Sequence, residues 1–348
     1  MQKTLLILLG LLLFSSVQSQ KKIKETIIAL GSCGQESKPQ PTLAMAASWK
    51  PDFFVFLGDN VYGDTYNMDT LQMKYQKLAN QPAFQKLKGS TRLIATWDDH
   101  DYGWNDIGRH YSKKDASKNI FLNFWEEPKE SPRWTRDGIY TSYYYKVESK
   151  IIQFIVLDTR TFRDDLLPYP DSLPVKRPFF YQLDYLPHSS KDSTLLGDQQ
   201  WRWLENELKQ PADIRIICSS TQFGAAYNGY EAWANFPHEQ DKMVQLIQKT
   251  KASGVLFISG DVHYGEISKR VYPGLYPLYD VTSSGITSTW LFATPNQYRI
   301  EGPIMDNHIA RLRIQWRKDP LIIMEIVDIH QNVRVEYSIS LSDLNFKS

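Results

Sequence analysis

Short apolar runs recur along the chain, and each run ends in a group of polar residues. The runs are five to seven residues long and rich in Ile, Val, Leu and Phe, which is typical of strands buried on both faces of a sheet. They occupy residues 26–30, 53–57, 92–97, 151–157, 214–218 and 255–259. We therefore expect these segments to form the strands of the central part of the fold.

Segments with a helical period lie between several of these runs. In residues 200–208, Trp201, Leu204 and Leu208 fall on one helical face, and we expect Asp198 to cap the start. Similar spacing predicts helices over residues 42–49, 71–78 and 238–249. Strands and helices in alternation predict an α/β fold.

The C-terminal part of the chain has a different pattern. Residues 310–317, 320–329 and 333–339 have the pattern of consecutive strands with short turns, so we expect an antiparallel section of a second sheet. This tail argues against a (β/α)8 barrel, which needs eight regular strand–helix units. Residues 103–145 and 160–195 lack a strong period and are dense in Trp, Tyr and Pro. Insertions of that length usually shape a functional surface.

The N-terminus has the layout of a secretory signal, with Lys3, an apolar run over residues 5–14 and a small polar stretch. We expect a signal peptide over residues 1–19 and a secreted or periplasmic protein. The apolar run is too short to cross a bilayer as a helix. Residues 20–348 contain no repeat and no Gly/Ser linker, so they predict a single domain.

Composition narrows the class of protein further. Hydrophobic residues make up 42% of the chain and charged residues 23%, as in ordinary globular proteins. The formal net charge of +1 gives no signature of nucleic-acid binding, and we expect a monomer without a transmembrane segment. The only two cysteines, Cys33 and Cys218, exclude a disulfide-rich scaffold. One disulfide between them stays open.

The polar groups at the strand ends are rich in residue types that bind metals. A single Asp after a strand is most often a helix cap, but here several strand ends carry Cys, Asp or His. The carboxyl ends of the strands of an open α/β sheet meet at one edge, where ligands bind. We therefore expect one site there, made of Cys33, Asp59, Asp99, Asp261 and His263.

These segments resemble the PhoD-type alkaline phosphatases and phosphodiesterases, a family of calcineurin-like and purple-acid-phosphatase-like metallophosphoesterases. The matching motifs are Gly58–Asp64, Trp97–Asp101 and Gly260–His263, together with Ser32-Cys33, which PhoD-type proteins have where relatives carry Asp-x-His. Two secondary motifs agree, Leu157–Arg160 with Arg163, and Leu196–Leu204. The resemblance spans about residues 27–270, in the expected order.

The resemblance implies a four-layer α-β-β-α sandwich with antiparallel C-terminal strands. It also implies two or more metal ions, with Asp59 bridging two of them and with Cys33 and Tyr62 on Fe(III). The further ligands would be Asp99, Asp261 and His263. A site so rich in oxygen ligands favours hard cations such as Fe(III) and Ca(II) over zinc, and other divalent metals stay open.

The implied mechanism is in-line attack on phosphorus by a hydroxide that the metals activate. His100, which we expect Asp101 to orient, would protonate the leaving oxygen or bind phosphate. Arg160 or Arg163 would clamp a non-bridging phosphoryl oxygen, because a guanidinium fork matches phosphate geometry. Asn105 either reaches the second metal or only forms a turn.

Several residues have plainer explanations. Cys218 lies in an apolar run, and we expect it in the core. Asp98 is expected to support the site or cap a helix, and Asp158 to anchor the loop of Arg160. Gln222 stands where relatives often have a third metal-binding histidine, so that position departs from the family. Gly58 and Gly260 are expected where the backbone approaches a metal closely.

The function that the resemblance implies is a secreted metallophosphoesterase acting on a small-molecule or lipid phosphate ester. One alternative keeps the site but gives it a phospholipase-like or nucleotide-directed activity. Another is a non-catalytic secreted binding protein that retains the scaffold. PhoD proteins also carry a small domain before the Ser-Cys motif, and we expect it to be absent, since about a dozen residues separate the expected cleavage site from Cys33.

Overall fold

The computed structural model describes residues 23–170 and 183–347. The expected signal peptide, residues 1–19, lies outside these ranges, as do residues 171–182 of the second long insertion. Among the described residues, no helix is long and apolar enough to cross a membrane.

The first sheet joins the N-terminal strands to the C-terminal tail. Its strand order is β15-β14-β13-β1-β2-β3, with β1, β2 and β3 parallel and the pairs from β1 through β13 to β15 antiparallel. The strands are β1 (Glu25–Gly31), β2 (Phe53–Leu57), β3 (Arg92–Thr96), β13 (His308–Gln315), β14 (Leu321–Asp328) and β15 (Val333–Ser340). The tail strands therefore extend the N-terminal sheet, and their placement in a second sheet was wrong.

The second sheet has the order β12-β10-β11-β9-β8-β5-β4. Its members are β4 (Thr141–Val147), β5 (Lys150–Val156), β8 (Ile214–Cys218), β9 (Val255–Ser259), β10 (Gly265–Arg270), β11 (Leu278–Ser283) and β12 (Arg299–Ile304). Its centre, from β5 through β8 and β9 to β11, is parallel, and the outer pairs are antiparallel. A separate short pair joins β6 (Leu167–Pro168) to β7 (Tyr185–Leu186).

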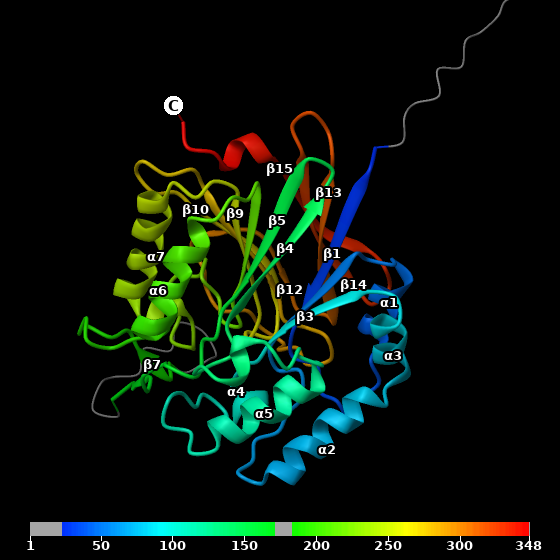
Figure 1. Ribbon diagram of the computed structural model, residues 1–348, viewed down its shortest axis with the longest axis vertical. Helices are drawn as coiled ribbons and strands as arrows, with labels where there is room; N and C mark the ends of the chain where they lie inside the picture. The colour runs from blue at the N-terminus through cyan, green and yellow to red at the C-terminus, as the bar shows by residue number, and fades with distance from the viewer. Residues whose placement is uncertain (1–22, 171–182, 348) are drawn as a thin grey trace, which may run out of the picture.

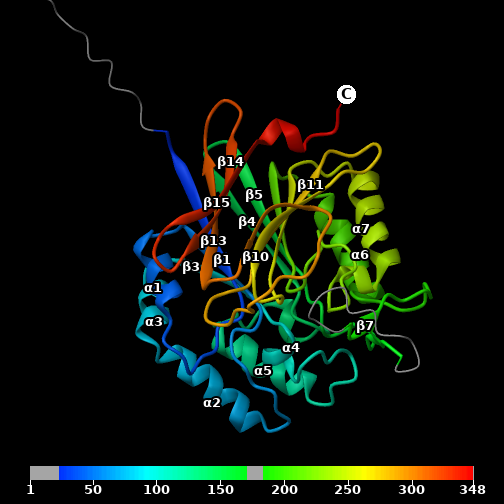
Figure 2. The same ribbon diagram turned by 180° about the vertical axis from the view of Figure 1, so that it is seen from behind.

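Helices cover the outer faces of the two sheets, which gives the expected four-layer sandwich (Figures 1 and 2). The helices of one side are α1 (Pro41–Ser48), α2 (Met68–Ala79), α3 (Pro82–Lys88) and α5 (Lys114–Phe124), and those of the other are α6 (Gly197–Leu208) and α7 (Pro237–Thr250). The short α4 (Asp99–Tyr102) follows β3, and three 3-10 turns cover Pro132–Trp134, Trp233–Asn235 and Leu341–Leu344.

Alternation along β2 shows how the first sheet is buried on both faces. Phe53, Val55 and Leu57 pack into the core between the sheets. Phe54 and Phe56 pack instead into the core beneath α1, α2, α3 and α5. An apolar run thus fills two cores at once, because successive side chains of a strand point to opposite faces.

Three local expectations differ from the structure. Helix α6 begins at Gly197, and Asp198 lies in its first turn without capping it; Thr194 Oγ1 accepts from the Gly197 N–H at 2.8 Å instead. Residues 103–145, which show no period, contain α5 and most of β4. Strands β10 and β11 were not predicted, since their buried polar residues interrupt the apolar pattern, and β12 escaped prediction because Ile304 is its only buried residue.

Candidate active site

The predicted ligands come together at one edge of the sandwich, after the ends of β1, β2, β3 and β9. Four of them have left-handed backbone conformations, with φ of 60° at Cys33, 50° at Asp59, 74° at Asp261 and 58° at His263. Side chains other than Gly adopt this region rarely, and such strain concentrates at functional sites. The strand ends are thus bent so that their side chains point into one space.

Cys33 lies at the buried back of this space. Its Sγ is 3.3 Å from Asp59 Oδ2 and 3.0 Å from Ser284 Oγ. Burial raises the pKa of the Cys33 thiol to about 12. Burial also raises the pKa of Tyr62, together with the charges of Cys33 and Asp59. The thiol of Cys33, the carboxyl of Asp59 and the phenol of Tyr62 therefore lie close together. Only a strongly charged cation would keep all three deprotonated at once.

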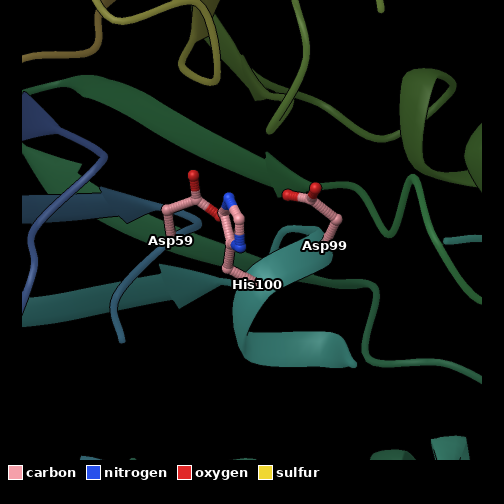
Figure 3. Close-up of side chains that lie close together, drawn as sticks. All are labelled: Asp59, Asp99 and His100. Atoms are coloured by element: carbon pink, nitrogen blue, oxygen red, sulfur yellow. The ribbon is translucent and has the colours of Figure 1, made fainter. Parts of the chain in front are cut away.

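Asp99 is the centre of the acidic cluster. Within residues 23–170 and 183–347, three groups of side chains offer ligand atoms within 4.8 Å of one another, and Asp99 belongs to all three. The groups are Asp59–Asp99–His100, Asp98–Asp99–Asp261 and Asp99–Asp106–Glu231. Figure 3 shows the first of them, with Asp59 from the loop after β2 and Asp99 and His100 from α4.

Arg160 and His100 bring positive charge to the cluster, but several of its carboxylate oxygens accept no hydrogen bond from the residues that the structure describes. Asp59 Oδ1, Asp98 Oδ2 and Asp99 Oδ1 are buried without a hydrogen-bond partner among the described residues. Burial and the neighbouring acidic groups raise the pKa of Asp59 and of Asp261 well above the usual range. Unpartnered buried carboxylate oxygens are costly, so this donor set fits one or more bound cations.

Asp99 itself stays ionised. Burial would raise its pKa, but the charges of Arg160 and His100 and the Asp106 N–H, which donates to Oδ2 at 2.6 Å, lower the pKa to about 2. Its Oδ1 lies 3.7 Å from Arg160 Nη2 but accepts no hydrogen bond among the described residues. An ionised carboxylate with such an oxygen is well suited to bind a metal.

His100 is oriented by Asp64, and the expectation that Asp101 orients it was wrong. His100 Nδ1 is 2.8 Å from Asp64 Oδ1. Asp101 accepts instead from the Asp98 N–H at 2.6 Å and from Asn60 Nδ2 at 2.5 Å, which ties α4 to the loop after β2. Burial would lower the pKa of His100, but Asp59 and the hydrogen bond to Asp64 help raise it to about 10.

His263 is also held by its Nδ1, which is 3.1 Å from the carbonyl oxygen of Ser288. A carbonyl can only accept, so Nδ1 carries the proton and Nε2 keeps its lone pair for a metal. Burial lowers the pKa of His263, which favours this neutral form.

Arg160 and Arg163 lie behind the acidic cluster. Both are fully buried. Arg160 donates to Asp98 Oδ1 from Nε at 2.5 Å and to both oxygens of Glu231 from Nη1 at 2.8 Å. Arg163 Nε is 3.2 Å from Glu231 Oε1. These contacts position acidic residues, and they leave neither guanidinium group in the cavity lining.

Asp98 and Asp158 have the supporting contacts that we expected of them. Asp98 accepts from Arg160 and from Ser220 Oγ at 2.7 Å. Asp158 Oδ1 accepts from the backbone N–H of Arg160 and of Thr161, both at 2.9 Å, and so anchors that loop.

A cavity of about 180 Å³ lies over the cluster. Asp59, Asp99, His100, Asp261 and His263 line its acidic part. Its other lining residues include Asn105, Asp106, Tyr185, Tyr230, Glu231 and Trp290.

Asp106 and Glu231 were not predicted from the sequence. Asn105 Nδ2 donates to Asp106 Oδ2 at 2.8 Å. Neither acidic residue follows a predicted strand, but the motif Trp104-Asn105-Asp106 so soon after Asp99 was a signal that could have identified the first of them.

The structure also bears on the expectations for the two cysteines, Gln222 and Gly58. Cys33 and Cys218 are both free and buried, so the disulfide alternative was wrong. Gln222 is buried beside β10 and β11, where Nε2 donates to Glu266 at 3.1 Å and Thr282 at 3.0 Å. At Gly58 an added Cβ would lie 2.4 Å from the Asp98 Cβ, so the close approach there is to the next strand end.

The chain is similar in sequence to a known phosphatase. Alkaline phosphatase D of Bacillus subtilis (strain 168) is 22% identical over 223 residues, which are 55% of this chain and 36% of that protein. The chain thus spans about a third of the length of this relative.

Solved structures show the same fold. A structure of PhoD superposes with a TM-score of 0.69 at 16% identity, covering 93% of this chain and 71% of that one. The purple acid phosphatase PPD1 of yellow lupin (Lupinus luteus) gives a TM-score of 0.58 at 12% identity, covering 93% and 55%. The family model described as PhoD-like phosphatase matches residues 32–295. Since this match covers most of the chain, the protein belongs to the PhoD-like phosphatase family.

Proposed function

We propose that this protein is a secreted, metal-dependent hydrolase of phosphoric esters. The observation that carries the proposal is the sharing of Asp99 by three potential ligand groups beneath one cavity. The unpartnered oxygens of Asp59, Asp98 and Asp99 support it, because they call for cations at this place.

Cys33, Asp59 and Tyr62 would hold one ion, for which a thiolate and a phenolate favour Fe(III). Asp99, Asp261 and His263, helped by Asp106 and Glu231, would hold one or more further ions such as Ca(II). Bound in this way, the metals would lower the pKa of a water molecule and neutralise charge on the phosphoryl oxygens.

The chain's own residues supply proton transfer and positioning. His100 would present Nε2 to the leaving oxygen while Asp64 holds Nδ1, and would donate a proton there. Asn105 lines the cavity and would donate a hydrogen bond to a phosphoryl oxygen. Arg160 and Arg163 act as positioning residues in this proposal. Arg160 forms ion pairs with Asp98 and Glu231, and Arg163 forms one with Glu231.

The substrate class that fits this cavity is a small phosphate ester. Tyr185, Tyr230 and Trp290 also line the cavity, where the Tyr185 hydroxyl donates to Asp106 Oδ2 at 2.6 Å, and the three rings would contact the leaving group. That lining suits nucleotide or lipid diesters as well as simple esters, so a phospholipase-like or nucleotide-directed activity is the second candidate. We expect the protein to act as a monomer.

The test is elemental analysis of the purified protein together with hydrolysis of p-nitrophenyl phosphate and bis-p-nitrophenyl phosphate. We expect iron and calcium in near-stoichiometric amounts, and loss of both metal and activity in Asp99→Ala. Asp69→Ala, on the exposed first turn of α2, is the matched control and retains both. Wild-type protein that binds no metal, and stays inert after iron and calcium are added, would leave the non-catalytic binding protein as the better explanation.

A further inference from the structure

A second cavity, of about 230 Å³, lies between the outer helices and the edge of the first sheet. Helix α3 contributes Phe84 and Lys88, β3 contributes Leu93 and Ala95, and α5 contributes its last residue, Phe124. The segment after α5 and strand β4 complete the wall. This cavity shares no lining residue with the one over the acidic cluster.

Arg133 is the chemically unusual residue of this cavity. It is 1% exposed, yet its Nε and Nη2 have no hydrogen-bond partner among the described residues. Only Nη1 is engaged, and it donates to Glu127 Oε2 at 2.8 Å and to the Tyr143 hydroxyl at 3.5 Å. The guanidinium carbon lies 5.5 Å from the ring centroid of Phe121, which supports one face of the group.

The two free nitrogens form one edge of the guanidinium plane. Nε–H and an N–H of Nη2 are parallel donors, and this fork matches the two oxygens of a carboxylate. Trp125 Nε1, from the same lining, is a third buried donor without a partner. A buried set of unpaired donors is costly unless a ligand or water accepts from it.

The other lining residues determine what kind of group the carboxylate of a ligand can be attached to. Phe84, Leu93 and Phe124 present apolar surface. A cavity of about 150 Å³ is large enough to hold benzene, so this larger one admits a ring of that size together with a carboxylate. Glu127 already places one negative charge beside Arg133, which disfavours a ligand with two charges.

We propose that this cavity is a second ligand site, which binds a monocarboxylate with a small apolar or aromatic body. The carboxylate accepts from Nε and Nη2 of Arg133, and the apolar body lies against Phe84 and Phe124. The site is independent of the proposed hydrolysis, because it uses none of the residues of the acidic cluster.

The test is calorimetric titration of the full chain with benzoate, with benzamide as the uncharged analogue of similar shape. We expect benzoate to bind at least tenfold more tightly than benzamide, and orthophosphate not to compete. Arg133→Lys keeps the charge but loses the fork, so it should weaken benzoate binding at least tenfold. Glu127→Gln keeps an acceptor for Nη1 but removes the repelling charge, so it should strengthen binding.

Asp59→Asn changes the acidic cluster but no lining residue of this cavity, so it distinguishes the two sites. It should leave benzoate binding unchanged. Circular dichroism of each variant shows whether the fold is retained. The opposite shifts expected of Arg133→Lys and Glu127→Gln cannot both follow from loss of structure. Equal binding of benzoate and benzamide, no binding of benzoate, competition by orthophosphate, or loss of binding in Asp59→Asn would each overturn the proposal.

Discussion

Buried carboxylates occur in two parts of the first sheet, and their surroundings are opposite. Glu325 of β14 is 1% exposed and lies directly across from Arg311 of β13. Arg311 holds one of its oxygens, and Arg313 Nη1 holds the other at 3.0 Å. Asp59, after the end of β2, is also 1% exposed, but its Oδ1 has no partner among the described residues.

The difference shows that burial of an acid does not by itself mark a functional site. A buried carboxylate that cations match on both oxygens is part of the scaffold. A buried carboxylate that other acids surround destabilises the protein when no ligand is bound. Such a group persists at sites where a bound ligand compensates its charge. Removing the charge should therefore have opposite effects on stability in the two places.

The largest effect is expected for Asp59→Asn. Asparagine tolerates the φ of 50° at this position and keeps an acceptor for Cys33, but it removes a metal-binding charge. We expect hydrolysis of bis-p-nitrophenyl phosphate to fall about 10³-fold, since metal-ion stabilisation of a transition state is worth several kcal/mol. Without metal, the free energy of unfolding should rise, which urea denaturation in a chelator measures. A variant that is less stable than the wild type there would contradict the comparison.

Glu325→Gln should do the reverse. It leaves Arg311 and Arg313 without their shared partner, and breaking a buried ion pair costs about 3–5 kcal/mol. We expect about 3 kcal/mol, because the arginine side chains are 18% and 27% exposed and water can reach them. The activity of the folded variant should equal that of the wild type. Loss of activity without loss of stability would show that the two regions are coupled.

The sequence predicted most of the scaffold because apolar runs carry strong information about buried strands. The run over residues 53–57 is apolar throughout, and its side chains are buried in both cores, as the pattern predicts. Strands β10 and β11 escaped prediction because Glu266, Ser268 and Asp280 are buried in them. Glu266 pairs with Arg299, and Asp280 accepts from Ser259 Oγ at 2.8 Å. Such pairs form across the fold and leave no local pattern.

The site was predictable where a ligand follows a strand end, as Asp59 and Asp99 do. Asp106 and Glu231 lie on loops that long-range contacts place, so their position in sequence gave no reason to join them to the cluster. The partner of His100 was misjudged for a related reason. Asp101 is adjacent in sequence, but its carboxylate accepts from the backbone N–H of Asp98, the residue that caps its own helix. Asp64, from another loop, is left to hold the imidazole.

His308 of β13, the strand that pairs with the strand of Glu325, allows a test through the pH dependence of stability. Both nitrogens of His308 are satisfied, Nε2 by the Ser284 N–H at 3.2 Å and Nδ1 by the Asp306 carbonyl at 2.8 Å. Burial lowers its pKa from 6.5 to about 4. Between these values the unfolded chain binds the proton and the folded chain does not, so stability is full above pH 6.5 and falls as the pH falls towards 4.

The loss from His308 should reach about 2 kcal/mol at pH 5, relative to pH 7. Urea denaturation at several pH values, in a chelator, measures it against His308→Gln. Glutamine offers a donor and an acceptor but does not titrate. The variant should be less stable at pH 7 and show a shallower slope between pH 6.5 and 4. Equal slopes in the two proteins would mean that other groups carry the acid sensitivity.

The smallest effect is expected for Asp64→Asn. This variant tests the role of the His100 imidazole, whose pKa the neighbouring carboxylates raise. Asparagine tolerates the φ of 43° at this position and can accept from His100 Nδ1, so the ring should stay in place while losing a negative neighbour. If His100 protonates the leaving oxygen, kcat should fall about tenfold for alkyl esters, whose leaving groups need the proton. For p-nitrophenyl esters, whose leaving group departs as a stable anion, kcat should change little, and KM should hold for both. A purely structural role of Asp64 would lower kcat equally for the two ester types, so the ratio between them decides whether His100 is the acid.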